Sequence, residues 1–124
     1  GISVNGCFVL GLDGDTEDFF DLIPEFVEET ALYDVQVTVQ TPFPGTPLYQ
    51  RLAAAGRLIE PRNWRKCSLF DVNFQPAHMT AARLEERFRE LVAVLYDEEA
   101  VGRRHRRFMK LYGSSFRELQ PAIA

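Results

Sequence analysis

Apolar and polar residues alternate along two short segments within the first forty residues, a pattern typical of half-buried β-strands. In segment 2–12 the residues that share the more apolar face are Ile2, Val4, Gly6, Phe8 and Leu10. Segment 34–40 has a valine at every second position, namely Val35, Val37 and Val39. The opposite face of that segment carries Gln36, Thr38 and Gln40. The pattern therefore predicts two strands, each with one apolar and one partly polar face.

A helical pattern lies between the two predicted strands. Its apolar residues recur at helical spacing and are Phe19, Phe20, Ile23, Phe26 and Val27. Asp15 is predicted to cap this helix, which should end between Thr30 and Leu32. Pro24 lacks a backbone N–H, so we expect a kink or a break just before it. A strand, a helix and a strand in succession predict a βαβ unit with parallel strands and a right-handed crossover.

The partly polar strand faces favour one kind of parallel sheet over another. In an open parallel sheet helices cover both faces, so both faces are usually apolar. In a barrel helices cover the outside, whereas the inner face can be polar near a ligand. We therefore expect an α/β fold in which two parallel strands form a βαβ fragment of a partial TIM barrel.

The remaining sequence predicts a mostly helical extension. Thr46 followed by Pro47 fits a helix start, and this helix should run to about Ala55 and stop at Gly56. The irregular segment that follows should pack through Trp64, Phe70, Val72 and Phe74. We expect three parts: barrel strands and helices over 1–56, a connector over 57–79 and a helical extension over 80–124.

Two helices are predicted in the extension. Thr80 should cap the longest helix of the chain, whose buried stripe comprises Leu84, Phe88, Leu91, Val92 and Leu95. A last helix should span roughly residues 97–112 and stop at Gly113. One more turn can follow from Ser114, and Pro121 should end it.

Composition and cysteine usage narrow the classes of protein. A chain of 124 residues with 46% hydrophobic residues is long enough for one modest core. No apolar run reaches the roughly 18 to 20 residues that a membrane span needs. Cys7 and Cys67 lie too far apart for a metal or redox motif, so we expect buried thiols in a reducing cytoplasm rather than a disulfide.

The two parts of the chain differ in charge. Residues 1–50 hold nine acidic residues and no Lys or Arg, whereas residues 51–124 hold nine acidic and fourteen basic residues. Such parts can attract one another or face different neighbours. The later basic cluster comprises Arg103, Arg104, Arg106, Arg107 and Lys110. Interleaved aromatic platforms are lacking there, so a solvated helix or a docking face is favoured over nucleic-acid binding.

Three segments are candidates for binding. The turn 11–16 lies between a strand and a helix, but Asp13 and Asp15 would repel phosphate. Their carboxylates suit ribose hydroxyls, an ammonium group or helix capping. The turn 42–49 follows the second strand, where parallel α/β folds place active sites, and is either a binding loop or a rigid connector. The polar row over 36–40 is either a lumen surface or an exposed edge.

Metal binding and self-contained catalysis are not predicted. His78 and His105 have no second ligand at a useful spacing. The sequence shows no Ser-His-Asp or Cys-His arrangement typical of nucleophilic catalysis. We therefore predict no catalytic residue and no metal ligand in this chain.

Two motifs in order carry a resemblance to a known family. They are the segment 8–16, FVLGLDGDT, and the segment 42–49, PFPGTPLY. This combination resembles the late barrel strands of cobalamin-binding radical SAM enzymes. The later segment 69–76, LFDVNFQP, followed by Met79 sharpens the resemblance toward the hopanoid-methylase-like members, beside the bacteriochlorophyll-cyclase-like members of the same branch.

The resemblance covers nearly the whole chain and implies where S-adenosylmethionine (SAM) would bind. Residues 1–12 would correspond to the fifth barrel strand, residues 34–40 to the sixth, and the rest to a C-terminal extension. By the resemblance, Val9 and Gly11 would lie beside the SAM adenine. The backbone at Thr41, Pro42 and Phe43 would approach the same adenine.

The resemblance also implies what this chain lacks. The three-cysteine loop that holds a 4Fe–4S cluster and the cobalamin signature are both absent from the sequence. Because the chain begins with Gly1 rather than Met, we expect it to be a segment of a larger enzyme that uses SAM, a 4Fe–4S cluster and cobalamin. That enzyme would methylate a lipid or isoprenoid-like substrate, and the segment alone would be inactive.

The implied partner of the chain is the rest of that enzyme, including its upstream barrel half and cobalamin domain. Open sheet edges would also allow a homodimer. The alternative is an autonomous α/β binding or docking module without catalysis, which shares only the βαβ pattern.

Overall fold

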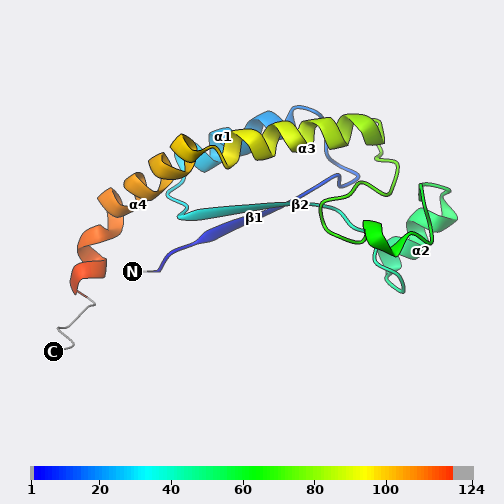
Figure 1. Cartoon of the computed structure of the whole chain (residues 1–124), viewed down its shortest axis with the longest axis horizontal. Coiled ribbons are helices and arrows are strands. Elements are labelled where there is room, and N and C mark those ends of the chain that lie inside the picture. Colours follow the sequence, from blue (N-terminus) through cyan, green and yellow to red (C-terminus); the bar gives the residue numbers. More distant parts are fainter. Residues whose placement is uncertain (1, 119–124) are drawn as a thin grey trace.

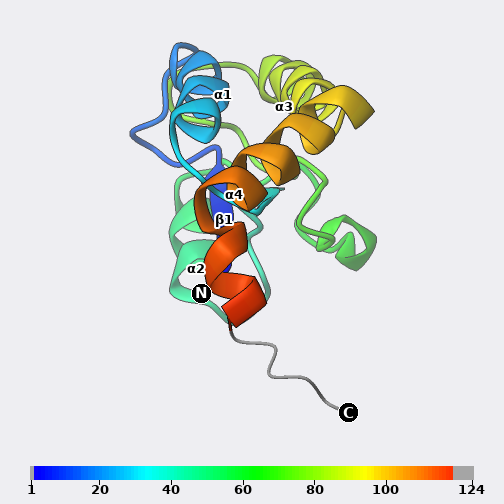
Figure 2. The ribbon, with the colours of Figure 1, turned by 90° about the vertical axis from the view of Figure 1, so that its left-hand side faces the viewer.

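The computed structural model describes residues 2–118, with side chains described over residues 2–113. In chain order its elements are β1 (Asn5–Leu10), α1 (Phe19–Glu29), β2 (Asp34–Val39), α2 (Pro47–Ala54), the 3-10 turn η1 (Trp64–Lys66), α3 (Ala81–Leu95) and α4 (Glu98–Glu118). This confirms the predicted α/β class, with one βαβ unit and a mostly helical C-terminal part. Helices α1 and α3 lie side by side on one face of the sheet, and α2 lies beyond the carboxyl ends of the strands (Figure 1, Figure 2).

The two strands are parallel and in the register that the alternation requires. Their pairing runs from Asn5 opposite Asp34 to Leu10 opposite Val39. On β2 the three valines are buried, while Gln36 on the other face is exposed. On β1 Leu10 is fully buried, whereas Val9 is exposed. One face of the sheet is therefore covered by helices and the other is uncovered, as predicted.

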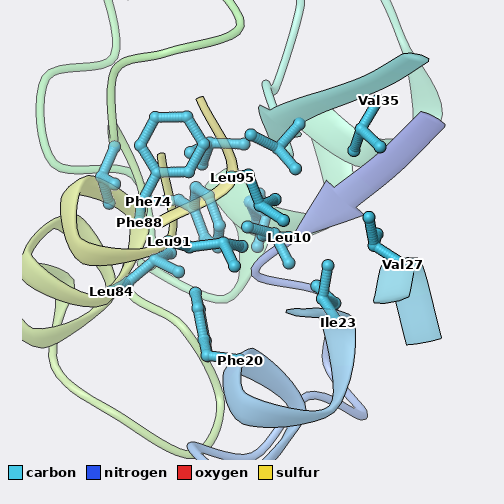
Figure 3. Packing of buried hydrophobic residues seen from close by; sticks show 14 residues of the cluster. Leu10, Phe20, Ile23, Val27, Val35, Phe74, Leu84, Phe88, Leu91 and Leu95 are labelled. Atoms are coloured by element: carbon cyan, nitrogen blue, oxygen red, sulfur yellow. The ribbon is translucent and has the colours of Figure 1, made fainter. Parts of the chain in front are cut away.

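The core forms where the covered sheet face meets α1 and α3. In Figure 3 the side chains of the two strands, of α1 and of α3 converge on one another, with Phe74 from the connector among them. The members that lie on α1 and α3 share helical spacing and are Phe20, Ile23, Val27, Leu84, Phe88, Leu91 and Leu95. Burial of these apolar surfaces is the main force that holds the helices on the sheet.

The start of α1 corrects two predictions. Asp15 does not cap the helix, because the N-cap position is Asp18, and Asp18 makes no side-chain capping hydrogen bond. Pro24 lies inside α1 and the helix continues to Glu29, so the predicted break is wrong and the predicted kink stays a prediction. Ile23 and Val27 on either side of the proline are buried, and this packing outweighs the lost backbone hydrogen bond.

Predictions for the later elements are confirmed in part. The side chains of Thr46 and Thr80 cap α2 and α3 as predicted, because each accepts a hydrogen bond from the backbone N–H three residues later, of Tyr49 and Arg83 respectively. Trp64 and Phe70 are wrong as packing anchors, since both are exposed. Val72 and Phe74 are buried as predicted.

The last helix is longer than predicted. Helix α4 has 21 residues against 15 in α3, so α3 is not the longest helix. It also runs through Gly113 instead of stopping there, because one glycine in a helix costs only about 1 kcal/mol. The predicted stop at Pro121 lies outside the described residues.

The acidic and basic parts of the chain attract one another. Arg83 and Arg87 of α3 pair with Glu17 and Asp21 near the start of α1. At the other end of the molecule the guanidinium of Arg103 lies 3.6 Å from the carboxylate of Glu28. The opposite charges therefore join the helical extension to the βαβ unit.

The basic cluster on α4 divides between solvent and interior. Arg103, Arg106, Arg107 and Lys110 are exposed, as a solvated helix predicts. Arg104 is instead buried, and its Nη1 donates a 2.6 Å hydrogen bond to the carbonyl of Leu95 at the end of α3. The guanidinium thus satisfies a carbonyl at a helix C-terminus, where positive charge is favourable.

The two cysteines are more exposed than predicted. Cys7 and Cys67 are free thiols, but Cys7 is exposed and Cys67 is half-buried, so the prediction that both are buried is wrong. Within the described part of the chain, no helix combines the length and the apolar character that crossing a membrane requires.

Candidate functional site

The carboxyl ends of β1 and β2 meet at one edge of the sheet, and the chain is tightly fixed there. The N–H of Gln40 donates to the carbonyl of Leu10 at 2.7 Å and extends the parallel ladder one residue past β2. The hydroxyl of the buried Thr41 donates to the carbonyl of Val39 at 3.1 Å. Pro42 is buried beside it. The backbone that leaves β2 therefore presents a rigid surface at this edge.

Gly11 begins the turn after β1 in a conformation that favours glycine. Its φ is +88°, in the left-handed region. A Cβ atom there would lie 2.8 Å from Leu84 Cδ2 and 2.9 Å from Phe74 Cζ. Backbone and core thus approach each other too closely for any side chain.

The Asp15 carboxylate holds this turn closed. Its Oδ2 accepts hydrogen bonds from the N–H groups of Gly11 at 2.9 Å and Leu12 at 3.0 Å. Asp15 is 9% exposed, so these bonds satisfy a largely buried charge. Helix capping by this carboxylate is therefore replaced by closure of the turn, while ribose or ammonium binding stays a prediction.

Asp13 joins the same turn to the rest of the molecule. Its carboxylate accepts a 2.8 Å hydrogen bond from Arg57 Nη2 and lies 3.3 Å from Arg51 Nη1 of α2. Arg57 also donates from Nε to the carbonyl of Gln75 at 2.8 Å. The hydrogen bond from Arg57, with the charges of Arg57 and Arg51, holds the pKa of Asp13 below its usual value.

The predicted SAM-binding residues lie at this edge in two groups. Gly11, Thr41 and Pro42 are buried and offer backbone. Val9 and Phe43 expose apolar side chains, at 47% and 40% exposure. Exposed apolar side chains can pack against a flat heteroaromatic ring, so Val9 and Phe43 stay predicted contacts of such a ring.

The polar row of β2 does not present a uniform surface. Gln36 is exposed, Thr38 is half-buried and Gln40 is buried. The Nε2 atom of Gln40 is buried and has no hydrogen-bond partner in the described part of the molecule. Only the earlier part of the row therefore faces solvent on the uncovered sheet face.

A metal or cluster site does not fit the described residues. Cys7 and Cys67 are the two thiols, whereas a 4Fe–4S cluster takes four cysteine ligands or three with SAM. No group of three or more His, Cys, Asp and Glu side chains is arranged for a metal within residues 2–113. His105 stacks on Tyr33, with ring centroids 4.4 Å apart.

One feature of the edge was missed by the sequence analysis. The carbonyl of Leu69 accepts a 2.7 Å hydrogen bond from the N–H of Val39, so the connector reaches the last residue of β2. Leu69 has a φ of +68°. The sequence gives no local sign that a leucine adopts the left-handed conformation. Ser68 and Asp71, three residues apart, form a turn-stabilising pair and could have predicted a turn there.

This chain is similar to a known protein family and to three known proteins. A family model described as a domain of unknown function, DUF4070, matches residues 46–122, which is more than half of the chain. A bacteriochlorophyllide d C-12(1)-methyltransferase from Chlorobaculum tepidum is 27% identical over 83% of this chain and 22% of its own length. An uncharacterized methyltransferase from Pyrococcus horikoshii is 27% identical over 77% of this chain and 21% of its own length.

A third relative matches at a similar level. A hopanoid C-2 methylase from Rhodopseudomonas palustris is 28% identical over 85% of this chain and 19% of its own length. The chain thus spans about a fifth of the length of the curated relatives it matches. The resemblance to the C-terminal portion of cobalamin-binding radical SAM enzymes is confirmed, and the chain belongs to the DUF4070 family.

Proposed function

We propose that this chain supplies the last two barrel strands and the helical C-terminal part of a larger radical SAM methyltransferase. The uncovered face of its parallel sheet carries the proposal. Helices cover the opposite face, while the exposed Cys7, Val9 and Gln36 leave this face open to a further part of a protein or to a ligand. A barrel wall has this arrangement. The three relatives, all named as methylases or methyltransferases, are about five times longer than the matched region.

We further propose that the strand ends form part of the SAM-binding wall. Val9 and Phe43 would contact the adenine through their apolar side chains. The backbone at Gly11, Thr41 and Pro42 would approach the ring edge, where a backbone carbonyl can accept a hydrogen bond from the amino group of adenine. A 4Fe–4S cluster and cobalamin, held elsewhere in the longer protein, would supply the radical and methyl-carrier chemistry.

The substrate that we propose is a lipid or isoprenoid-like molecule with an unactivated carbon as methyl acceptor. The relative named as a hopanoid methylase supports this class. The free thiols of Cys7 and Cys67 support a reducing compartment, and we propose the cytoplasm.

The test uses the full-length gene product, purified without oxygen and reconstituted with iron, sulfide and cobalamin. We expect reductive cleavage of SAM to 5′-deoxyadenosine. Val9→Asp should weaken SAM binding about tenfold or more, because it places a charge against an apolar ring. Val94→Asp is the matched control, since Val94 is 55% exposed on α3. A gene product that cannot cleave SAM would favour the autonomous docking module.

Two measurements on the 124-residue chain examine its dependence on a partner. Calorimetric titration with SAM should show weak binding or none, and micromolar affinity would contradict an incomplete site. Light scattering tests whether the chain forms the homodimer that we propose for the isolated sheet. A strictly monomeric chain would argue against that association.

A further inference from the structure

The turn over residues 67–71 is attached to the outer edge of β2 at its carboxyl end. The N–H of Gln40 points toward β1, since it donates to Leu10. In an extended strand the N–H of the preceding residue points the opposite way. That group, on Val39, donates to the carbonyl of Leu69 at 2.7 Å. The turn therefore lies next to the strand end from which Thr41–Phe43 emerge.

The turn is strained and several contacts hold it in place. Leu69 is the one non-glycine residue with positive φ in the described part of the chain. The hydroxyl of Ser68 donates to the carboxylate of Asp71 and accepts the N–H of Phe70 at 3.2 Å. Val72 anchors the exit of the turn in the core. Strain of this kind persists only where the surroundings impose it, and it concentrates at ligand-binding sites.

The strained turn contributes little to the core of this chain. Leu69 is 38% exposed and Phe70 is 57% exposed. Trp64, 56% exposed, lies in the preceding turn η1, which is joined to Cys67 by a 3.1 Å backbone hydrogen bond. The fold thus holds a leucine in an unfavourable conformation and presents apolar and aromatic side chains to solvent. Intrachain packing does not explain this combination, which is typical of a binding surface.

We propose that the turn over residues 67–71 is a substrate-binding element and that Phe70 is a specificity-determining residue for a rigid, polycyclic apolar substrate. This inference rests on the proposed function, because it places the turn beside the SAM-binding wall. Aromatic side chains match such a substrate, since they are large and rigid and bury much apolar area against a ring system. A hopanoid and a chlorin ring share this chemistry, and the experiment separates them.

Trp64 provides the reporter, because it is the single tryptophan of the chain. The probe is bacteriochlorophyllide d, a coloured ring that quenches tryptophan fluorescence on binding. We expect saturable quenching in the 124-residue chain, and Phe70→Ala should raise the dissociation constant about tenfold. A hopanoid added as competitor should reverse the quenching if it is the preferred ligand, and fail to do so if the chlorin is preferred.

Phe26→Ala is the matched control, because Phe26 is 50% exposed on α1. It should leave the dissociation constant unchanged. Lack of quenching in the unsubstituted chain, or equal weakening by both substitutions, would overturn the proposal.

The full-length protein separates failure of this inference from failure of the proposed function. Phe70→Ala should raise the KM for the methyl acceptor about tenfold. Absence of SAM cleavage in the unsubstituted protein would reject the proposed function. Normal cleavage with an unchanged KM in the variant would reject only the role of Phe70. If Phe70→Ala instead lowered the melting temperature of the full-length protein alone, Phe70 would be an interdomain packing residue.

Discussion

Arg57 Nη2 donates a 2.8 Å hydrogen bond to Asp13 Oδ1, although the two residues lie 44 positions apart. The bond joins the turn after β1 to the segment after α2. Because Arg57 also donates to the carbonyl of Gln75, one guanidinium fixes two loops at the carboxyl end of the sheet. The rigidity of the candidate site therefore depends on this arginine.

Asp13→Asn should lower the free energy of unfolding at pH 7 by up to about 1 kcal/mol, a small value because the carboxylate is partly solvent-screened. The folded-state pKa of Asp13 is lowered, first by the hydrogen bond from Arg57. The stabilisation is therefore complete above the unfolded pKa and lost as pH falls through the folded pKa. Urea unfolding should show the difference at pH 7 and a smaller one below about pH 4.

The two arginines around Asp13 offer an internal comparison. Arg57→Gln should destabilise the chain at least as much as Asp13→Asn, because it also loses the bond to Gln75. Arg51→Gln should change the unfolding free energy by less than about 0.5 kcal/mol, since Arg51 is largely exposed. Equal effects of the two arginine substitutions would contradict this account.

Gly11→Ala should destabilise the chain by about 2–4 kcal/mol, from left-handed backbone strain together with overpacking against Leu84 and Phe74. Gly14→Ala is the control, because a Cβ there would meet no atom within 4 Å. We expect the control to stay within about 0.5 kcal/mol of the unsubstituted chain. Thermal unfolding followed by circular dichroism measures both, and similar melting temperatures would refute the close approach.

Arg87 holds α1 and α3 together more effectively than an exposed arginine would. Its side chain is 16% exposed, and its guanidinium bonds Asp21 of α1 at 2.6 Å and Glu90 at 2.7 Å. Arg87→Lys should lower the free energy of unfolding by about 1–2 kcal/mol, because an ammonium group cannot reproduce the planar fork. The control Arg89→Lys, at a residue 74% exposed, should have little effect.

Salt distinguishes the two arginine sites. Half-buried pairs are screened less than exposed pairs. The destabilisation by Arg87→Lys should therefore persist when urea unfolding is repeated at about 0.5 M salt, well above the physiological range. Disappearance of the difference in salt would show that the Arg87 pairs act only as surface charges.

Leu69→Asn should stabilise the chain by about 0.5–1 kcal/mol. Asparagine tolerates the left-handed conformation better than leucine, and little apolar burial is lost at this half-exposed position. Urea unfolding measures the change in the free energy of unfolding. Leu48→Asn is the comparison, and it should destabilise the chain because Leu48 packs against the core. Loss of stability in both variants would argue against strain at Leu69.

The parts of the fold that could be predicted depend on local chemistry. The alternation of valines in 34–40 specifies a buried face whatever surrounds it, and Thr46 and Thr80 cap their own helices. Asp15 shows where local information ends. The acid before a helical pattern fits a cap, but in the structure it bonds backward to Gly11 and Leu12. Nothing in the spacing decides whether the Asp15 carboxylate bonds to the following helix or to the preceding turn.

The candidate site could be predicted only in part for a related reason. Its place at the strand ends follows from topology, because parallel strands bring their carboxyl ends together. Hydrophobicity does not separate a core anchor from a ligand-binding side chain, so Phe70 and Phe74 look alike in sequence. Phe70 is 57% exposed, whereas Phe74 is fully buried. The left-handed backbone at Leu69, which the sequence does not reveal, directs the chain so that Phe70 is exposed.

The parallel register has a kinetic consequence. Every paired residue on β1 meets a partner 29 positions later, from Asn5 with Asp34 to Leu10 with Val39, so no short hairpin can nucleate the sheet. The entropy cost of closing that loop opposes folding until the two strands pair. Helix α1 shortens the loop and brings Ile23 and Val27 to the sheet. We therefore expect α1 to belong to the folding nucleus, with α4 docking after the rate-limiting step.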